Sequence, residues 1–233
     1  MVWDHVVAGS NPAAPTIEKF MKDLFNNCKI IGKFEEFPTV FYVAQIDDET
    51  RIECINYLKV IRSQDPNKYK TDPRVWISTD ELHMRQEFSP LIEWMNSFHK
   101  TIADEQEIEY HNVYCSGMWA NFSKRHYSHM QHTHPNSWRS AILYLQLPQG
   151  SSKTVFNNPV QNEIQYDFKK LNKINAFQYV PQIEEGLTIS FPSHINHSVP
   201  SNINMQTDKE RISLSFNFNL NATMTRLTQK WKI

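Results

Sequence analysis

Two histidines in one short polar segment are the first residues in the chain that could do chemistry. The segment 131–145, QHTHPNSWRSAILYL, places His132 and His134 two positions apart. Side chains two apart in an extended backbone point to the same side, so these two imidazoles could share a metal ion. Solvated polar loops show the same spacing, and His126 and His129 just upstream fit that interpretation as well. The pair alone therefore leaves both interpretations open.

A third imidazole stands on a later segment, 191–200, with the sequence FPSHINHSVP. A strand is expected to end at Pro192, and a short extended stretch then carries His197. His194 follows the proline directly, in an expected turn, so we take it as a loop residue and His197 as the candidate metal ligand. The competing interpretation is that His197 is a surface histidine.

The segment 211–218, RISLSFNF, alternates strictly between apolar and polar residues. This pattern predicts a strand with one face in the core and one polar face, which could be exposed to solvent or could form the wall of a site. Arg211 and Ser213 would place a guanidinium group and a hydroxyl on that polar face. A guanidinium can bind a carboxylate through two parallel hydrogen bonds, so the pair suits a carboxylate ligand.

Composition and charge exclude several classes of protein. The chain has 233 residues, of which 40% are hydrophobic and 12% aromatic, too many for a disordered chain. Its formal net charge is -1, so nothing indicates a nucleic-acid partner. No apolar run approaches the roughly 20 residues of a membrane span, and no signal peptide is evident, so we expect no membrane partner and a cytoplasmic location. The three cysteines, Cys28, Cys54 and Cys115, lack CxxC spacing and suit a reducing compartment.

The elements that must position these residues fall into two parts of one structural domain. Residues 1–106 read as a helical N-terminal part packed on the core, and residues 107–233 as a β-rich core. Helical spacing of apolar residues predicts helices at 16–26, 48–63 and 88–102, with a strand at 39–46 and a possible return to helix at 222–232. Short β-type runs separated by turn residues predict strands at 110–122, 140–147, 154–156, 176–179, 187–191 and 211–220. Such strands are typical of an antiparallel sandwich or barrel.

Taken together, these motifs resemble the iron(II)/2-oxoglutarate-dependent oxygenase superfamily, and specifically an oxygenase family seen in cyanophages and marine bacteria. The likeness covers roughly residues 75 to 220 and includes a helical approach at Trp76-Ile77-Ser78. Four motifs stand in the order of that family: Trp119-Ala120-Asn121; His132-Thr133-His134-Pro135 leading to Leu143-Tyr144-Leu145; Phe191-Pro192 with His197-Ser198-Val199; and Arg211-Ile212-Ser213 with Phe216-Asn217.

The resemblance implies a double-stranded β-helix, a jelly roll of two antiparallel sheets, in a mainly β protein with an α-helical N-terminal part. It implies an iron(II)- and 2-oxoglutarate-dependent oxygenase, a hydroxylase that consumes dioxygen and releases succinate and carbon dioxide. The substrate is not identified by any motif, and a peptidyl or prolyl residue is suggested only by analogy with the superfamily. The oligomeric state is likewise left open.

For the metal centre, the resemblance implies that His132, His134 and His197 hold the iron. The usual third ligand of the superfamily is a carboxylate two residues after the first histidine, and here that position is His134. Either His134 coordinates and the centre consists of three neutral imidazoles, or it turns away. We favour coordination, because the spacing places it on the same side as His132. Three neutral ligands leave two positive charges on iron, whereas the usual carboxylate leaves one.

For the cosubstrate, the resemblance implies that Arg211 binds the distal carboxylate of 2-oxoglutarate, with Ser213 as a supporting donor. Asn121 and Tyr144 are candidates for further polar contacts. The alternatives are that Tyr144 is a core aromatic residue and that Asn121 forms a turn at a strand end. No catalytic residue is expected beyond the metal centre.

Three other classes compete with this interpretation. A three-histidine metal dioxygenase that uses no 2-oxo acid would share the ligands but would not need Arg211 and Ser213. A non-catalytic jelly-roll binding or structural module, such as a virion component, would bind zinc or nothing. A hydrolytic zinc enzyme is less favoured, since no glutamate or aspartate accompanies the histidines as a general base.

Overall fold

The computed structural model describes residues 38–65, 72–160, 168–173 and 175–222. The elements described below belong to one compact unit that begins at Thr39. The helix predicted at 16–26 and nearly all of the segment 222–232 lie outside the described residues.

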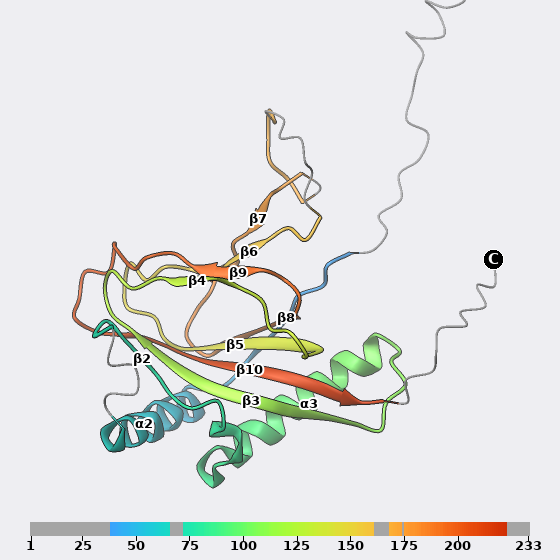
Figure 1. Ribbon diagram of the computed structural model, residues 1–233, viewed down its shortest axis with the longest axis horizontal. Helices are drawn as coiled ribbons and strands as arrows, with labels where there is room; N and C mark the ends of the chain where they lie inside the picture. The colour runs from blue at the N-terminus through green and yellow to red at the C-terminus, as the bar shows by residue number, and fades with distance from the viewer. Residues whose placement is uncertain (1–37, 66–71, 161–167, 174, 223–233) are drawn as a thin grey trace, which may run out of the picture. The chain divides into compact units, whose positions relative to one another are not determined.

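A six-stranded antiparallel sheet forms the centre of this unit (Figure 1). Its strand order is β1-β8-β5-β10-β3-β2, so strands far apart in the chain become neighbours. The strands are β1 (Tyr42–Gln45), β2 (Val75–Ile77), β3 (Asn112–Ser123), β5 (Arg139–Gln146), β8 (Leu187–Pro192) and β10 (Arg211–Asn221). Strand β10 pairs with β3 on one side and with β5 on the other, which places the last described strand in the middle of the sheet.

A smaller antiparallel sheet has the order β4-β9-β6-β7. Its strands are β4 (His129–His132), β6 (Val155–Asn157), β7 (Gln178–Tyr179) and β9 (His197–Val199). In Figure 1 strands β4 and β9 lie over one face of the large sheet, while the helices lie under the opposite face. The two antiparallel sheets confirm the predicted jelly roll, and the predicted strands appear with shifts of one or two residues in most cases.

Two α-helices cover the outer face of the large sheet. Helix α2 (Asp48–Gln64) begins after Asp47, whose carboxylate accepts a hydrogen bond from the Thr50 backbone N–H at 2.8 Å. Such a side-chain cap satisfies one of the free N–H groups of the first turn. Helix α3 (Ser89–Glu105) follows two short 3-10 turns, Leu82–Met84 and Gln86–Phe88.

Two hydrophobic clusters hold the layers together. The larger one lies between the helices and the large sheet and includes Leu58 of α2, Met95 of α3 and Phe216 of β10. The smaller one lies between the two sheets and includes Phe156 of β6 and Phe191 of β8. Each fully buried aromatic side chain contributes about 1.5–3 kcal/mol through the apolar surface it removes from water.

Side chains along β10 alternate between its two faces, so one strand contributes both to the core and to the site. Phe216 and Phe218 are fully buried in the helix-covered cluster. Arg211 and Ser213 point to the opposite face, toward the small sheet, and each is only 3% exposed. The polar face predicted from the sequence is therefore an interior wall rather than a solvent-exposed surface.

One local expectation was wrong. The stretch Trp76–Ser78 was expected to be a helical approach, but Val75–Ile77 forms the edge strand β2, paired with β3. The stretch is anchored by Trp76, which is 2% exposed and donates its indole N–H to the Asp65 carbonyl at 2.7 Å. Strands β1 and β2 both precede residue 107, so the division of the chain into 1–106 and 107–233 stays a prediction.

Within the part of the chain that the structure describes, no helix is long and apolar enough to cross a membrane.

Candidate metal centre and carboxylate pocket

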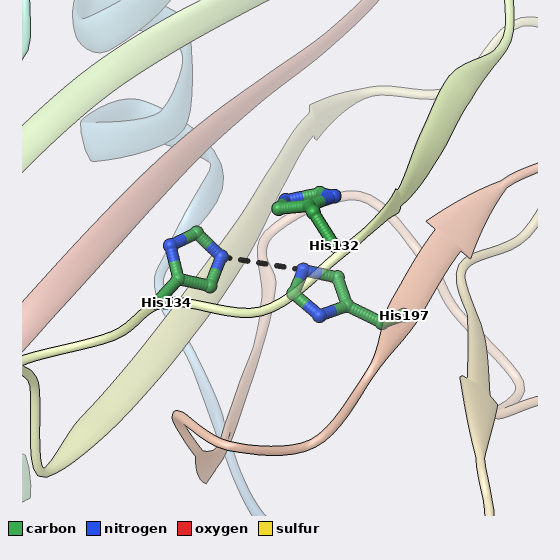
Figure 2. Close-up of side chains that lie close together, drawn as sticks. All are labelled: His132, His134 and His197. Carbon is green, nitrogen blue, oxygen red and sulfur yellow. Dashed lines mark hydrogen bonds between the residues drawn. The ribbon is translucent and has the colours of Figure 1, made fainter.

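Three histidine side chains gather between the two sheets. His132 ends β4 and His197 begins β9, and the two residues are direct partners in the antiparallel ladder. His134 follows β4, where its backbone N–H donates to the Ser193 carbonyl at 2.9 Å. Figure 2 shows the three rings grouped around one point, with His134 and His197 facing each other through their Nε2 atoms, which are 3.3 Å apart.

Backbone carbonyls fix the orientation of two of these rings. The Nδ1 atom of His132 lies 2.8 Å from the Met130 carbonyl oxygen, and Nδ1 of His197 lies 3.0 Å from that of Ile195. A carbonyl oxygen can only accept, so Nδ1 carries the proton in each ring. The neutral ring then has its lone pair on Nε2, as is usual for metal-binding histidines.

The spacing of the nitrogens fits a single metal ion. One ligand atom from each of His132, His134 and His197 lies within 4.8 Å of the others. Two nitrogens bound at about 2.1 Å and at right angles around a metal are about 3.0 Å apart, close to the 3.3 Å between His134 and His197. The widest separation, up to 4.8 Å, would have to shorten toward that value to complete a three-nitrogen site.

Burial keeps the imidazoles of His134 and His197 neutral, the form in which they bind metals. Desolvation lowers the pKa of His197 to about 3, with the neighbouring His132 and His134 acting in the same direction. Desolvation also lowers the pKa of His134 to about 4. Neutral nitrogen lone pairs are therefore available well below the ordinary histidine pKa of 6.5.

A buried arginine faces the same cavity with much of its hydrogen-bonding capacity unused. Arg211 donates from Nη1 to the Ser213 hydroxyl at 3.3 Å, while its Nε and Nη2 atoms have no hydrogen-bond partner among the described residues. The guanidinium carbon lies 5.4 Å from the centroid of the Tyr144 ring. Burial lowers the Arg211 pKa from its ordinary value, and Tyr144 opposes that shift. Buried donors without partners are costly, so this geometry suits an anionic ligand.

The other two candidates for cosubstrate contacts take different positions. Asn121 lines the cavity, where its amide donates to the Ser215 hydroxyl at 3.2 Å and its Oδ1 has no partner among the described residues. Tyr144 is fully buried, with its hydroxyl 2.9 Å from the Thr154 hydroxyl, and supports Arg211 from the core side. Asn121 thus forms part of the cavity wall, while Tyr144 lies behind it.

His129 is a cavity residue that sequence reasoning assigned no role. It lines the cavity and its ring stacks on that of His132, with centroids 4.7 Å apart. Desolvation lowers its pKa to about 4, with His132 and Arg211 adding to the shift. No sequence signal marked it, because its position depends on the register of β4 against β9. His129 faces Val199 and His132 faces His197, so β4 holds one extra residue between these pairs. A bulge of this kind brings residues three apart to the same face.

The cavity carries no acidic side chain. Sixteen described residues line it, among them Trp119, Asn121, His129 and Ser198, and none is aspartate or glutamate. Glu210, the sequence neighbour of Arg211, pairs with Arg62 instead, with Nη1 to Oε2 at 2.6 Å. A metal ion bound by the three imidazoles would keep both of its positive charges.

Comparison with known proteins identifies this arrangement. The model of a protein family described as "Putative 2OG-Fe(II) oxygenase" matches residues 117–217, where 2OG stands for 2-oxoglutarate. Residues 117–217 are thus similar to that family. The matched segment contains His132, His134, His197 and Arg211, so all the candidate ligands lie within it. No curated protein matches the sequence.

Several solved structures share the fold. A prolyl-4-hydroxylase from Pseudomonas putida is similar with a TM-score of 0.53 and 11% identity, covering 79% of this chain and 94% of its own. The carbocyclase SnoK from nogalamycin biosynthesis gives 0.58 and 7%, covering 78% and 80%. HygX from Streptomyces hygroscopicus, solved with nickel and 2-oxoglutarate bound, gives 0.52 and 10%, covering 80% and 84%. These similarities confirm the double-stranded β-helix fold.

Proposed function

We propose that this protein is an iron(II)- and 2-oxoglutarate-dependent oxygenase that hydroxylates its substrate. The observation that carries the proposal is the presence, in one cavity, of a three-histidine cluster and a buried arginine with two unpaired donor atoms. A metal site alone would fit several enzyme classes. The additional unpaired guanidinium favours a metal-binding acid with a second, distal carboxylate, as 2-oxoglutarate is.

In this proposal His132, His134 and His197 hold the iron through their three ring nitrogens. The carbonyls of Met130 and Ile195 keep two of the rings in the tautomer that presents Nε2 to the metal. The backbone bond from His134 to Ser193 holds the segment after β4 against the loop before β9. Three protein ligands would leave positions on a bound metal open for the cosubstrate and dioxygen.

Arg211 and Ser213 bind the distal carboxylate of the cosubstrate. The unpaired Nε and Nη2 atoms of Arg211 are adjacent donors of the kind that engage both oxygens of a carboxylate. Tyr144 and Thr154 keep the guanidinium in place from behind, through the ring contact and their mutual hydrogen bond. Asn121 supplies a polar wall between the arginine and the metal.

When bound, iron supplies the coupling of 2-oxoglutarate decarboxylation to oxygen insertion, with succinate and carbon dioxide as the other products. The residues of the chain contribute binding, orientation and a cavity partly closed to water. A prolyl or other peptidyl residue stays a prediction for the substrate. The likeness to the P. putida prolyl-4-hydroxylase supports it at the level of the shared fold.

The test is an anaerobic titration of the iron(II)-loaded protein with 2-oxoglutarate, following the visible charge-transfer band of an iron-chelated 2-oxo acid. We expect the band to appear and to saturate at one equivalent. The Arg211→Ala variant should weaken cosubstrate binding by about 2–4 kcal/mol, because a charge-assisted double hydrogen bond is lost. Thermal unfolding of the variant without ligands shows whether its fold is intact.

Two other outcomes would contradict the proposal. Stoichiometric iron binding without the band would indicate a three-histidine dioxygenase that uses no 2-oxo acid. A protein that binds neither iron nor 2-oxoglutarate would indicate a non-catalytic jelly-roll module.

A further inference from the structure

The cavity has one more positive charge than a bound cosubstrate can balance. This charge balance rests on the proposed function. Three imidazoles leave both positive charges on the iron, and the two carboxylates of 2-oxoglutarate balance them. The positive charge of Arg211 then remains, and no acidic residue stands among the sixteen that line the cavity. The carboxylate that is usual at the position of His134 would have balanced it.

This excess charge lies in a buried place, where it has a substantial effect. Arg211 is 3% exposed and His197 is 4% exposed. An uncompensated charge in a poorly solvated cavity is strongly unfavourable unless a counter-charge is supplied. The described side chains supply none here, so a ligand other than the cosubstrate is the remaining source of a negative charge. A single negative charge suffices, which favours a carboxylate over a phosphate dianion.

The strand pairing indicates where such a ligand would lie. Along β3 and β10, Arg211 pairs with Ser123 at one end of the polar wall and Ser215 pairs with Trp119 at the other. Four residues of strand separate these ends, which corresponds to about 13 Å. The distal carboxylate of the cosubstrate occupies the Arg211 end, which leaves the Trp119 end for another ligand.

Trp119 has the properties of a residue that contacts such a ligand. It is partly exposed and lines the cavity, and its ring centroid lies 5.5 Å from that of His134. Its indole N–H, a donor only, has no hydrogen-bond partner among the described residues. Trp119 thus offers an apolar ring and one N–H group beside His134, the residue that replaces the usual carboxylate.

We propose that the substrate of this oxygenase carries a carboxylate, which binds beside His134 and Trp119 while 2-oxoglutarate occupies the Arg211 end of the cavity. The carboxylate can belong to a small organic acid or to an acidic side chain of a peptide. The negative charge would be the feature by which the enzyme distinguishes this substrate from a neutral molecule of the same shape.

The test uses isosteric probes that differ only in charge. Acetate and acetamide are titrated by calorimetry into the anaerobic protein loaded with iron(II) and saturating 2-oxoglutarate. The charge-transfer band, recorded on the same samples, shows that the cosubstrate stays bound. We expect acetate to bind at least about 10-fold more tightly than acetamide. The same comparison with capped glutamate and capped glutamine shows whether a free acid or a peptide side chain is preferred.

Two variants locate the effect. His134→Asp restores the usual carboxylate and should abolish the preference for acetate, because the excess charge is removed. Trp119→Phe keeps an aromatic ring but removes the N–H donor, so it should weaken acetate binding several-fold and leave the band and the iron affinity unchanged. Trp119→Phe stays informative if His134→Asp fails to fold.

Equal binding of acetate and acetamide in the loaded protein would overturn the inference. So would the absence of any acetate binding up to about 100 mM, or a preference that persists in both variants. Failure of the band to form before any probe is added would instead contradict the proposed function itself, so the two failures are distinguishable.

Discussion

The ring of His129 lies on the ring of His132, with centroids 4.7 Å apart and planes inclined by only 23°. This contact exists because β4 contains one extra residue relative to β9, which turns both histidines into the cavity. The nearly parallel rings indicate that His129 supports His132 from the side instead of joining it as a ligand. His132 is thus held by its ring contact and by the Met130 carbonyl.

The stacking contact predicts a difference between two substitutions. His129→Phe keeps a flat ring against His132 and should leave metal affinity within a few-fold of the native value. His129→Ala removes the support and should lower the affinity about 10-fold, the lower end of the range for residues that orient metal ligands. Competition with a chelator for cobalt(II) measures both. Equal loss in the two variants would show that the ring contact is not what matters.

His197→Ala should abolish stoichiometric iron binding, because His197 is the only one of the three candidate ligands that comes from β9. His194→Ala is the matched control, since His194 is exposed and lies three residues earlier in the same connection. Iron content after anaerobic loading and desalting decides the matter. Full retention of iron by His197→Ala would remove this residue from the metal centre.

His134→Ala tests whether the third imidazole coordinates. If it does, metal affinity should fall by at least about 10-fold, because a ligand bond and not merely its orientation is lost. Thermal unfolding of the metal-free variant is the control for fold. An unchanged metal affinity would mean that His134 turns away and that the centre has only two protein ligands.

Cosubstrate binding should stabilise the native protein and do so through Arg211. At a concentration about 100 times the dissociation constant, 2-oxoglutarate should add about 2.7 kcal/mol to the free energy of unfolding. For a domain of this size that corresponds to roughly 5–10 °C in the melting temperature. Arg211→Ala should lose most of this increase at the same concentration. Anaerobic melting curves of the iron-loaded proteins provide the measurement, and an equal increase in both would place the carboxylate elsewhere.

The buried His99 predicts a loss of stability in acid. Its Nε2 lies 3.0 Å from the Ser190 hydroxyl, its ring stacks on Phe218, and desolvation lowers its pKa to about 3. In the unfolded chain the pKa returns to about 6.5, so between these values the unfolded state binds more protons and stability falls as the pH falls. The slope from one such group is about 1.4 kcal/mol per pH unit.

His99→Gln should reduce the slope of the unfolding free energy against pH by the contribution of one group. The substitution keeps a polar side chain near Ser190. Urea unfolding of the metal-free protein between pH 4 and 7 measures it. Parallel curves for the native protein and the variant would show that His99 does not remain neutral in the folded state.

The fold class, which the structure confirms, and the candidate metal ligands could both be predicted because they depend on local patterns. The alternation of Arg211 to Phe218 is repeated in the two faces of β10: Phe216 and Phe218 pack in the core, while Arg211 and Ser213 line the cavity. His132 and His197 were recognisable as candidates from their segments. That they meet as direct partners across β4 and β9 is a property of sheet register.

What the sequence could not show depends on register and on long-range pairing. His129 looks like any histidine of a polar loop until the bulge in β4 turns it inward. The stretch Val75–Ile77 is too short for its pattern of apolar and polar residues to distinguish strand from helix. It forms a strand because it pairs with β3 at the edge of the sheet. The pairing of Ser215 with Trp119, which places the indole at the far end of the cavity from Arg211, involves residues 96 positions apart.

The position of β10 has a consequence for the order of events during synthesis. This strand lies between β3 and β5 but is made after both of them, so the large sheet stays open until the last described strand leaves the ribosome. The histidine segments are synthesised earlier, yet the wall opposite them is missing until Arg211 to Phe218 inserts. Contacts between such distant segments form slowly, and a nascent chain with an open sheet exposes unpaired strand edges. Insertion of β10 therefore closes the core and completes the cavity in a single late step.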